Sequence, residues 1–143
     1  MGRHRLNAMP YMCVQNLYNL LNRQMEREMF ALVRDMGLGL MAFSPLAVGL
    51  LSGTYSPGRP PPAGTLFGTR NRRDFPRMME ADSARVISAV LRLAAELGKT
   101  PAQLALAWVL SHPEITVAIS GTDTIAHLND TTWNVIDGNG AIV

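Results

Sequence analysis

The sequence predicts an α/β domain built on a small parallel sheet. Three short apolar runs, at residues 11–15, 38–43 and 116–120, are each bounded by turn-forming residues, which is the pattern of buried strands. The segments between them include stretches with the 3.6-residue apolar period of helices. Strands that alternate with helices pair in parallel, because each helix returns the chain to the same end of the sheet.

One helix is predicted between the first two strands. Residues 16–22 show no clear apolar period and are interpreted as a turn. Residues 26–36 carry apolar side chains at helical spacing, and Gly37 supplies a residue at which a helix can end in the left-handed conformation. The second strand, 38–43, follows directly.

A long segment without periodicity follows the second strand. The strand ends at Ser44 and Pro45, which favour a turn. Residues 47–80 are rich in Gly, Pro and Arg and are expected to form an irregular loop. A loop of this length in a compact domain is either functional or disordered.

Two helices are predicted before the third strand. The first covers residues 83–97. In the second, Thr100 can cap the helix, Pro101 suits its first position, and Gln103 can reach back to the cap. The buried face predicted for the first helix consists of Val86, Val90, Leu93, Ala94 and Leu97.

The third strand, 116–120, leads through Gly121 into a predicted helix over residues 124–135. Three parallel strands do not close a barrel, since a common parallel barrel has eight. The pattern alone therefore indicates either a small open sheet or a piece of something larger.

Composition excludes several classes of protein. The 143 residues are 48% hydrophobic and 17% charged, which is the balance of a globular protein. A net charge of +2, spread along the chain, predicts no nucleic-acid partner. No apolar stretch reaches the length of a membrane span, so no membrane insertion and a cytoplasmic location are expected. One cysteine, Cys13, excludes an intrachain disulfide, and with the three histidines it has no zinc-ligand spacing.

Four stretches, in order, resemble the aldo-keto reductase superfamily. The most similar branch includes the potassium-channel β subunits and related bacterial reductases. The stretches are VQNLYNLLNR at 14–23, LGLMAFSPLAVGLLSGTY at 38–55, PAQLALAWVLSHP at 101–113 and ISGTDTIAHL at 119–128.

The resemblance implies a partial (β/α)₈ TIM barrel. The chain would be a single partial domain, 1–143, that holds the last three βα units, with strands six to eight. The sixth unit would span 10–37, the seventh 38–113 with the long loop 47–80, and the eighth 114–137. The first five units of the barrel would be absent from this chain.

The resemblance also implies a nicotinamide-cofactor site. Gln15 matches the family's strand-end glutamine, which binds the nicotinamide carboxamide, although it could instead be a polar strand end in solvent. Phe43 matches the aromatic residue that stacks on the nicotinamide ring, although it could equally be a core residue. Residues of the following turn would hold the pyrophosphate, with successive N–H groups forming an anion nest. These are Ser44, Pro45, Leu46, Ala47 and Gly49.

Relatives use the segment after the last strand for the adenosine end of the cofactor. Gly121, Thr122 and Asp123 match it, and a helix N-terminus there favours phosphate. His127 stands where relatives have a glutamine near the adenine, and could otherwise be a surface helix residue. The Asp123 carboxylate would repel a 2′-phosphate, or would simply cap the helix. Either NADP(H) or NAD(H) is therefore expected.

Further departures from the family lie around the same end of the cofactor. Thr54 replaces a common lysine, and Thr131 replaces an asparagine that contacts adenine in relatives. Leu66 stands where relatives have an arginine, for which Arg70 could substitute.

The family's catalytic Asp, Tyr, Lys and His come from its first units, and no segment here resembles them. The only lysine, Lys99, lies between two predicted helices. We therefore expect a truncated aldo-keto reductase, which reduces carbonyl compounds with NAD(P)H when complete and is inactive alone. The alternatives are a non-catalytic nucleotide-binding or regulatory fragment and a self-associating fragment. The expected partners are a nicotinamide dinucleotide, the missing barrel part, or another copy of the chain.

Overall fold

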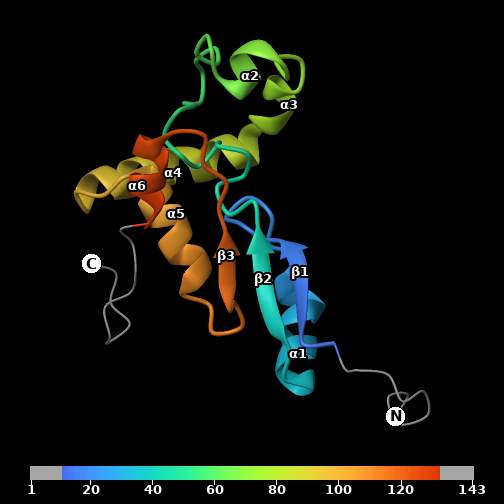
Figure 1. The fold of residues 1–143 in the computed structure, drawn as a ribbon. Helices are drawn as coiled ribbons and strands as arrows, with labels where there is room; N and C mark the ends of the chain where they lie inside the picture. Colours follow the sequence, from blue (N-terminus) through green and yellow to red (C-terminus); the bar gives the residue numbers. More distant parts are fainter. Residues whose placement is uncertain (1–10, 133–143) are drawn as a thin grey trace.

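The computed structural model describes residues 11–132 and contains one sheet of three strands (Figure 1). β1 (Cys13–Leu17), β2 (Gly39–Phe43) and β3 (Val117–Ile119) lie side by side in that order, and both pairs are parallel. The last residues of the three strands are level with one another. The predicted α/β class and parallel pairing are confirmed.

The first strand begins two residues later than predicted. β1 omits the first two residues of the predicted strand (11–15) and takes in the first two of the predicted turn (16–22). Tyr11 and Met12 are 81% and 75% exposed and precede the residues in register with β2, although the Met12 carbonyl accepts from the Gly39 N–H at 2.9 Å. The apolar character of a run does not indicate which of its residues find a partner strand.

The first helix and its end are as predicted. α1 (Met25–Met36) ends at Gly37, which has φ of 60°. Phe30 and Val33 of α1 pack against Leu40 of β2 in a core that also includes residues of α5. α1 therefore covers one face of the sheet.

The long segment 47–80 is not the irregular loop that was predicted. It contains α2 (Leu66–Thr69) and α3 (Phe75–Met78) and contributes to a second core. The rings of Tyr55, Phe67 and Phe75 in this core have centroids 5.3 to 5.6 Å apart. These contacts join residues distant in sequence, so no local apolar period announces them.

The two longer helices of the second half agree with prediction in position but not entirely in orientation. α4 (Ala81–Glu96) buries Ile87, Val90 and Ala94. Leu93 and Leu97, predicted to be buried, are 41% and 55% exposed. Ile87, which follows Val86, is buried although it was not predicted to be. The cluster that contains Tyr55, Phe67 and Phe75 packs against its side of α4.

α5 (Pro101–Leu110) begins with the predicted capping box between Thr100 and Gln103. Its residues Ala105 and Val109 are completely buried. The final described helix is α6 (Ile125–Thr132), and the rest of the helix predicted over 124–135 lies outside the described residues. No helix in the described part of the chain is long and apolar enough to cross a membrane.

The sheet is covered on one face only, within the described residues. Leu40 and Ala42 of β2 are fully buried beneath helices. Side chains of alternate residues point to the opposite face. On that face Phe43, Val117 and Ile119 are 38%, 45% and 40% exposed. A parallel sheet is normally covered on both faces, so this surface lacks its usual cover.

Candidate nucleotide-binding site

A cavity of about 710 Å³ lies just beyond the carboxyl ends of β2 and β3. Its walls come from residues 45–55 after β2, residues 64–66, Ala102 at the start of α5, residues 120–123 after β3, and the exposed side of α6. This is the end of a parallel α/β sheet at which ligands bind. The volume is in the range of small-molecule sites.

The turn after β2 is held in a left-handed conformation. Ala47, Val48 and Gly49 have φ of 49°, 57° and 88°. The left-handed conformation is a genuine outlier for a β-branched residue such as Val48, and strain of this kind persists where the surroundings impose it. Ser44, at φ of 54°, begins the same turn.

The N–H groups of this turn are not free to form the expected anion nest. The N–H of Ala47 donates to the Ser44 carbonyl at 3.0 Å, and that of Gly49 to the Leu46 carbonyl at 3.0 Å. The N–H of Val48 donates to the Ser44 hydroxyl at 3.3 Å. The turn therefore shapes the cavity wall rather than presenting a row of unpaired donors.

Asn19 positions this turn from the end of β1. Its side-chain amide donates to the Ser44 carbonyl at 2.9 Å, while its Oδ1 accepts from the N–H groups of Leu21 and Asn22. Asn19 is only 2% exposed. Sequence reasoning missed this residue, because 16–22 has no pattern and a single asparagine there looks like an ordinary turn residue.

On the other wall, Asp123 is paired with His127. The Nδ1 of His127 lies 2.6 Å from Asp123 Oδ1, and this hydrogen bond lowers the pKa of the Asp123 carboxyl. The prediction that Asp123 caps the following helix is wrong. Thr124 does so instead, because its hydroxyl accepts from the His127 N–H at 3.1 Å.

Asp130 and Ser120 are two further polar residues of the cavity wall. Asp130 of α6 accepts a hydrogen bond from the Thr100 hydroxyl at 2.9 Å, which ties α6 to the start of α5. The buried Oγ of Ser120 has no hydrogen-bond partner in the described part of the chain. Because this oxygen has almost no accessible surface, it lies behind the cavity wall and does not face a ligand. The cavity lining therefore combines carboxylate and hydroxyl groups, and no lysine or arginine of the described residues belongs to it.

The structure brings together some of the residues predicted for the site and leaves others apart. Seven of the predicted residues line the cavity, whereas Gln15, Phe43, Ser44 and Ala47 do not. Gln15 and Phe43 lie on the open face of the sheet. The seven are Pro45, Leu46, Gly49, Gly121, Thr122, Asp123 and His127.

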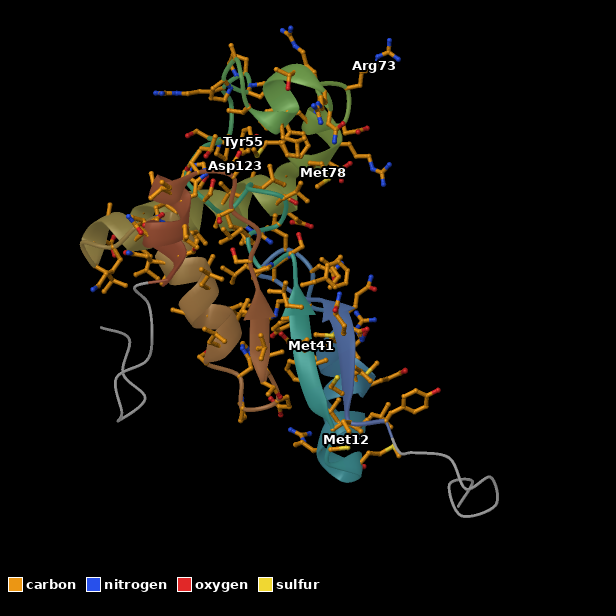
Figure 2. All side chains as sticks on the ribbon, in the orientation of Figure 1. Met12, Met41, Tyr55, Arg73, Met78 and Asp123 are labelled. Atoms are coloured by element: carbon orange, nitrogen blue, oxygen red, sulfur yellow. The ribbon has the colours of Figure 1, made fainter. Side chains whose placement is uncertain are left out.

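Several lining residues were not predicted. They include Ser52, Tyr55, Thr65, Ala102 and Asp130. Figure 2 shows Tyr55 and Asp123 close to each other in this region although they are far apart in sequence. The long segment after β2 and the start of α5 carry most of these residues, and only the packed fold places them at the cavity.

Two of the described tyrosines, Tyr18 and Tyr55, lie in the two cores. The Tyr18 hydroxyl is buried and donates to Glu26 at 2.7 Å; burial and this bond raise its pKa well above the usual range. Tyr55 is buried among the aromatic rings of the second core. In the described part of the chain, no three His, Cys, Asp or Glu side chains are grouped as metal ligands are.

Comparison with known proteins identifies the family to which the chain is similar. The model of the aldo/keto reductase family matches residues 3–135. A probable voltage-gated potassium channel subunit beta of Oryza sativa subsp. japonica is 37% identical over 120 residues, covering 82% of this chain and 36% of the relative. The uncharacterised oxidoreductase YrpG of Bacillus subtilis (strain 168) is 40% identical over 117 residues, covering 82% of this chain and 33% of the relative.

A relative of defined activity also matches. The L-glyceraldehyde 3-phosphate reductase of Escherichia coli (strain K12) is 30% identical over 123 residues, covering 85% of this chain and 36% of the relative. The chain thus spans about a third of the length of these curated relatives. Because the family model covers nearly the whole chain, the chain belongs to the aldo/keto reductase family.

Proposed function

We propose that this chain forms the dinucleotide-binding part of an aldo-keto reductase, and that alone it binds the cofactor without reducing carbonyl compounds. It would correspond to the last three βα units of the barrel, at 10–37, 38–113 and 114–137. The observation that carries the proposal is the cavity at the carboxyl ends of β2 and β3, lined by seven of the residues that the family resemblance assigns to the cofactor.

The two ends of the cofactor would occupy different surfaces. The adenosine end would enter the cavity beside Gly121 and Asp123. The nicotinamide would lie over the open sheet face, between the exposed side chains of Gln15 and Phe43. A ring face and an amide are suited to a nicotinamide, because one stacks on it and the other offers both a donor and an acceptor.

The whole protein would be an oxidoreductase of carbonyl compounds. Hydride transfer to a carbonyl needs a nearby proton donor for the developing alkoxide. The family resemblance assigns that donor to the first units of the barrel, so it would come from polypeptide beyond these three units. The names of YrpG and the Escherichia coli reductase support this class of reaction.

Self-association is the second candidate function. The open face of the sheet carries apolar side chains from all three strands, and the outer edges of β1 and β3 have no strand partner among the described residues. Unpaired edges and an uncovered apolar face invite pairing with another chain. A second copy could cover this surface where the remaining units do not.

A titration of the 143-residue chain with NADH, followed by cofactor fluorescence, tests the first proposal. The matched variants are Gly121→Leu and Ala31→Leu. A Cβ at Gly121 would meet no atom within 4 Å, so the larger side chain should fill the cavity without disturbing the fold. Ala31 is an exposed residue of α1, which contributes nothing to the cavity.

We expect saturable binding by the native chain and by Ala31→Leu. Gly121→Leu should weaken binding about tenfold or more, since it occupies space that the ligand needs. Neither the chain nor its variants should oxidise NADH when an aldehyde is added. Absence of saturable binding by the native chain, or turnover of the aldehyde, would contradict the proposal.

A further inference from the structure

We infer that the cavity selects a dinucleotide with a free 2′-hydroxyl, NAD(H), over its 2′-phosphorylated form, and that Asp123 makes this choice. The inference rests on the proposed function, because it concerns the same cavity. It goes further by assigning the chemical class of the ligand's adenosine end.

The charge of the cavity wall is the first observation. Two carboxylates, Asp123 and Asp130, line the cavity, and no lysine or arginine does so among the described residues. A phosphate monoester carries a charge of about −1.5 to −2 at neutral pH, and proteins hold it with arginine or lysine. A 2′-phosphate in this cavity would meet these two carboxylates, and the basic side chain that lines the cavity among the described residues, His127, is already paired with Asp123.

The nearby arginines do not correct this imbalance. Arg70, the residue that could have replaced the family's arginine, is exposed and is not among the lining residues. Leu66 and Gly64 occupy the wall on that side. Figure 2 shows Arg73 at the outer end of the α2–α3 segment, pointing away from Asp123. The basic side chains of this segment are thus turned to solvent.

The geometry at Asp123 is the second observation. His127 holds one oxygen of the carboxylate at 2.6 Å, which limits the freedom of the side chain, and 85% of that side chain remains exposed. A carboxylate is an acceptor with about four lone-pair sites, so it can accept from a ribose hydroxyl while still bonded to His127. The hydroxyls of a ribose are donors, whereas a 2′-phosphate offers mainly acceptors and charge.

The pairing with His127 also favours the ionised form of the carboxylate. The hydrogen bond lowers the pKa of the Asp123 carboxyl, so the acceptor form is present throughout the neutral range. Use of an acidic side chain to bind the ribose 2′-hydroxyl is a known solution in unrelated dinucleotide folds. Here the carboxylate stands at the end of β3 and is available for the same contact.

The alternative is that Asp123 and His127 form only a surface ion pair. Their side chains are 85% and 61% exposed, and an i,i+4 pair of this kind contributes little to stability. The two alternatives predict different effects of Asp123 on ligand binding. Only the first predicts that removing the charge of Asp123 changes the preference between the two dinucleotides.

The test compares dissociation constants of NADH and NADPH for the full chain and two variants. Asp123→Asn removes the charge and keeps an acceptor for His127. Asp82→Asn removes the same charge from an exposed carboxylate on α4, which is likewise paired within its own helix, to Arg85. The fragments 5′-AMP and adenosine 2′,5′-bisphosphate are measured by calorimetry as probes without nicotinamide.

We expect the native chain and Asp82→Asn to bind NADH about tenfold tighter than NADPH, the order of effect of one like charge near a partly solvated phosphate. Asp123→Asn should reduce this ratio several-fold, and the fragments should follow the same order. Equal or tighter binding of NADPH by the native chain would overturn the inference and leave the proposed function intact. An NADH preference unchanged in Asp123→Asn would also overturn it. If no probe binds, the inference and the proposed function fail together.

Discussion

Tyr18, in the core that also contains Phe30 and Leu40, shares the Glu26 carboxylate with Arg23. Its ring is fully buried and lies 5.3 Å from the Trp108 ring, and its hydroxyl donates to Glu26 at 2.7 Å. Arg23 donates two hydrogen bonds to the same carboxylate, at 2.7 and 2.9 Å, and its guanidinium lies 5.2 Å from the centre of the Trp108 ring. Glu26 thus satisfies a buried hydroxyl and fixes a cation over an aromatic face.

Replacement of Glu26 by glutamine should destabilise the chain by about 1–2 kcal/mol at neutral pH, because the bonds to Tyr18 and Arg23 lose their charged acceptor. Arg23 holds the pKa of Glu26 below its ordinary value of 4.5. The ionised form therefore favours the folded state above that value, and this contribution is lost as the pH falls through the lowered folded pKa.

Urea midpoints measured from pH 7 to 3 would show both effects. The Glu26→Gln variant should start lower and lose less stability on acidification than the native chain. Glu28→Gln, an exposed neighbour on α1, provides the control and should leave the curve almost unchanged. Parallel curves for the native chain and Glu26→Gln would rule out this role of the carboxylate.

The strain in the turn after β2 is also a property of one residue. Val48 has φ of 57°, a conformation that costs a residue with a Cβ about 1–2 kcal/mol. Glycine removes that cost but loses about 0.5–1 kcal/mol in chain entropy. Val48→Gly should therefore raise the free energy of unfolding by up to about 1 kcal/mol, measured in urea. Ala84→Gly, inside α4, should lower it by a similar amount, and a decrease in both variants would contradict this account.

At the level of the helices, the Thr100 hydroxyl forms hydrogen bonds to both α5 and α6. Thr100 accepts from the Gln103 N–H at 3.1 Å as the cap of α5, and its hydroxyl donates to Asp130 of α6 at 2.9 Å. Both helices contribute to the cavity, through Ala102 and through Asp130. The cap therefore couples the start of one helix to the position of the other.

Thr100→Ala should cost about 1–2 kcal/mol of stability, the effect of removing a side-chain cap together with a second bond. Hydrogen exchange should also become faster in the amides of α6. Thr100→Ser keeps the hydroxyl and should retain both properties, whereas Gln103→Ala should weaken α5 without affecting α6. Unchanged exchange in α6 of Thr100→Ala would show that the bond to Asp130 is dispensable.

At the level of the whole molecule, the open face of the sheet dominates. Three strands and their helices form two cores, yet Val117 and Ile119 remain 45% and 40% exposed beside Phe43. An apolar surface of this kind favours association with another chain at high concentration. The family's barrel architecture would cover it with other strands in a longer protein.

Sedimentation of the purified chain should therefore reveal association that rises with concentration. Ile119→Glu introduces a charge on the open face and should shift the distribution towards the monomer. Leu97→Glu places the same charge at the C-terminal cap of α4, at a leucine that is 55% exposed, and should have little effect. A native chain that stays monomeric at all concentrations would remove self-association as a candidate function.

The sequence alone determined those features that depend on neighbouring residues. The end of α1 at Gly37 and the capping box at Thr100 were predictable, since both are local hydrogen-bond and backbone preferences. The three strands and their parallel pairing followed from short apolar runs between helices. Part of the cavity, around Gly49 and Asp123, was anticipated from its resemblance to known cofactor segments.

Only the tertiary structure decided which partner each residue meets. The start of β1 depends on the register with β2, and the face of α4 depends on the aromatic rings of the segment before it. α2 and α3 form where Phe67 and Phe75 pack on Tyr55. The absence of lysine and arginine from the cavity wall in the described part of the chain was likewise hidden from local patterns. Such contacts join residues that are far apart in sequence, or they select one of several equally suitable neighbours. The pattern of residue types along the chain does not specify that selection.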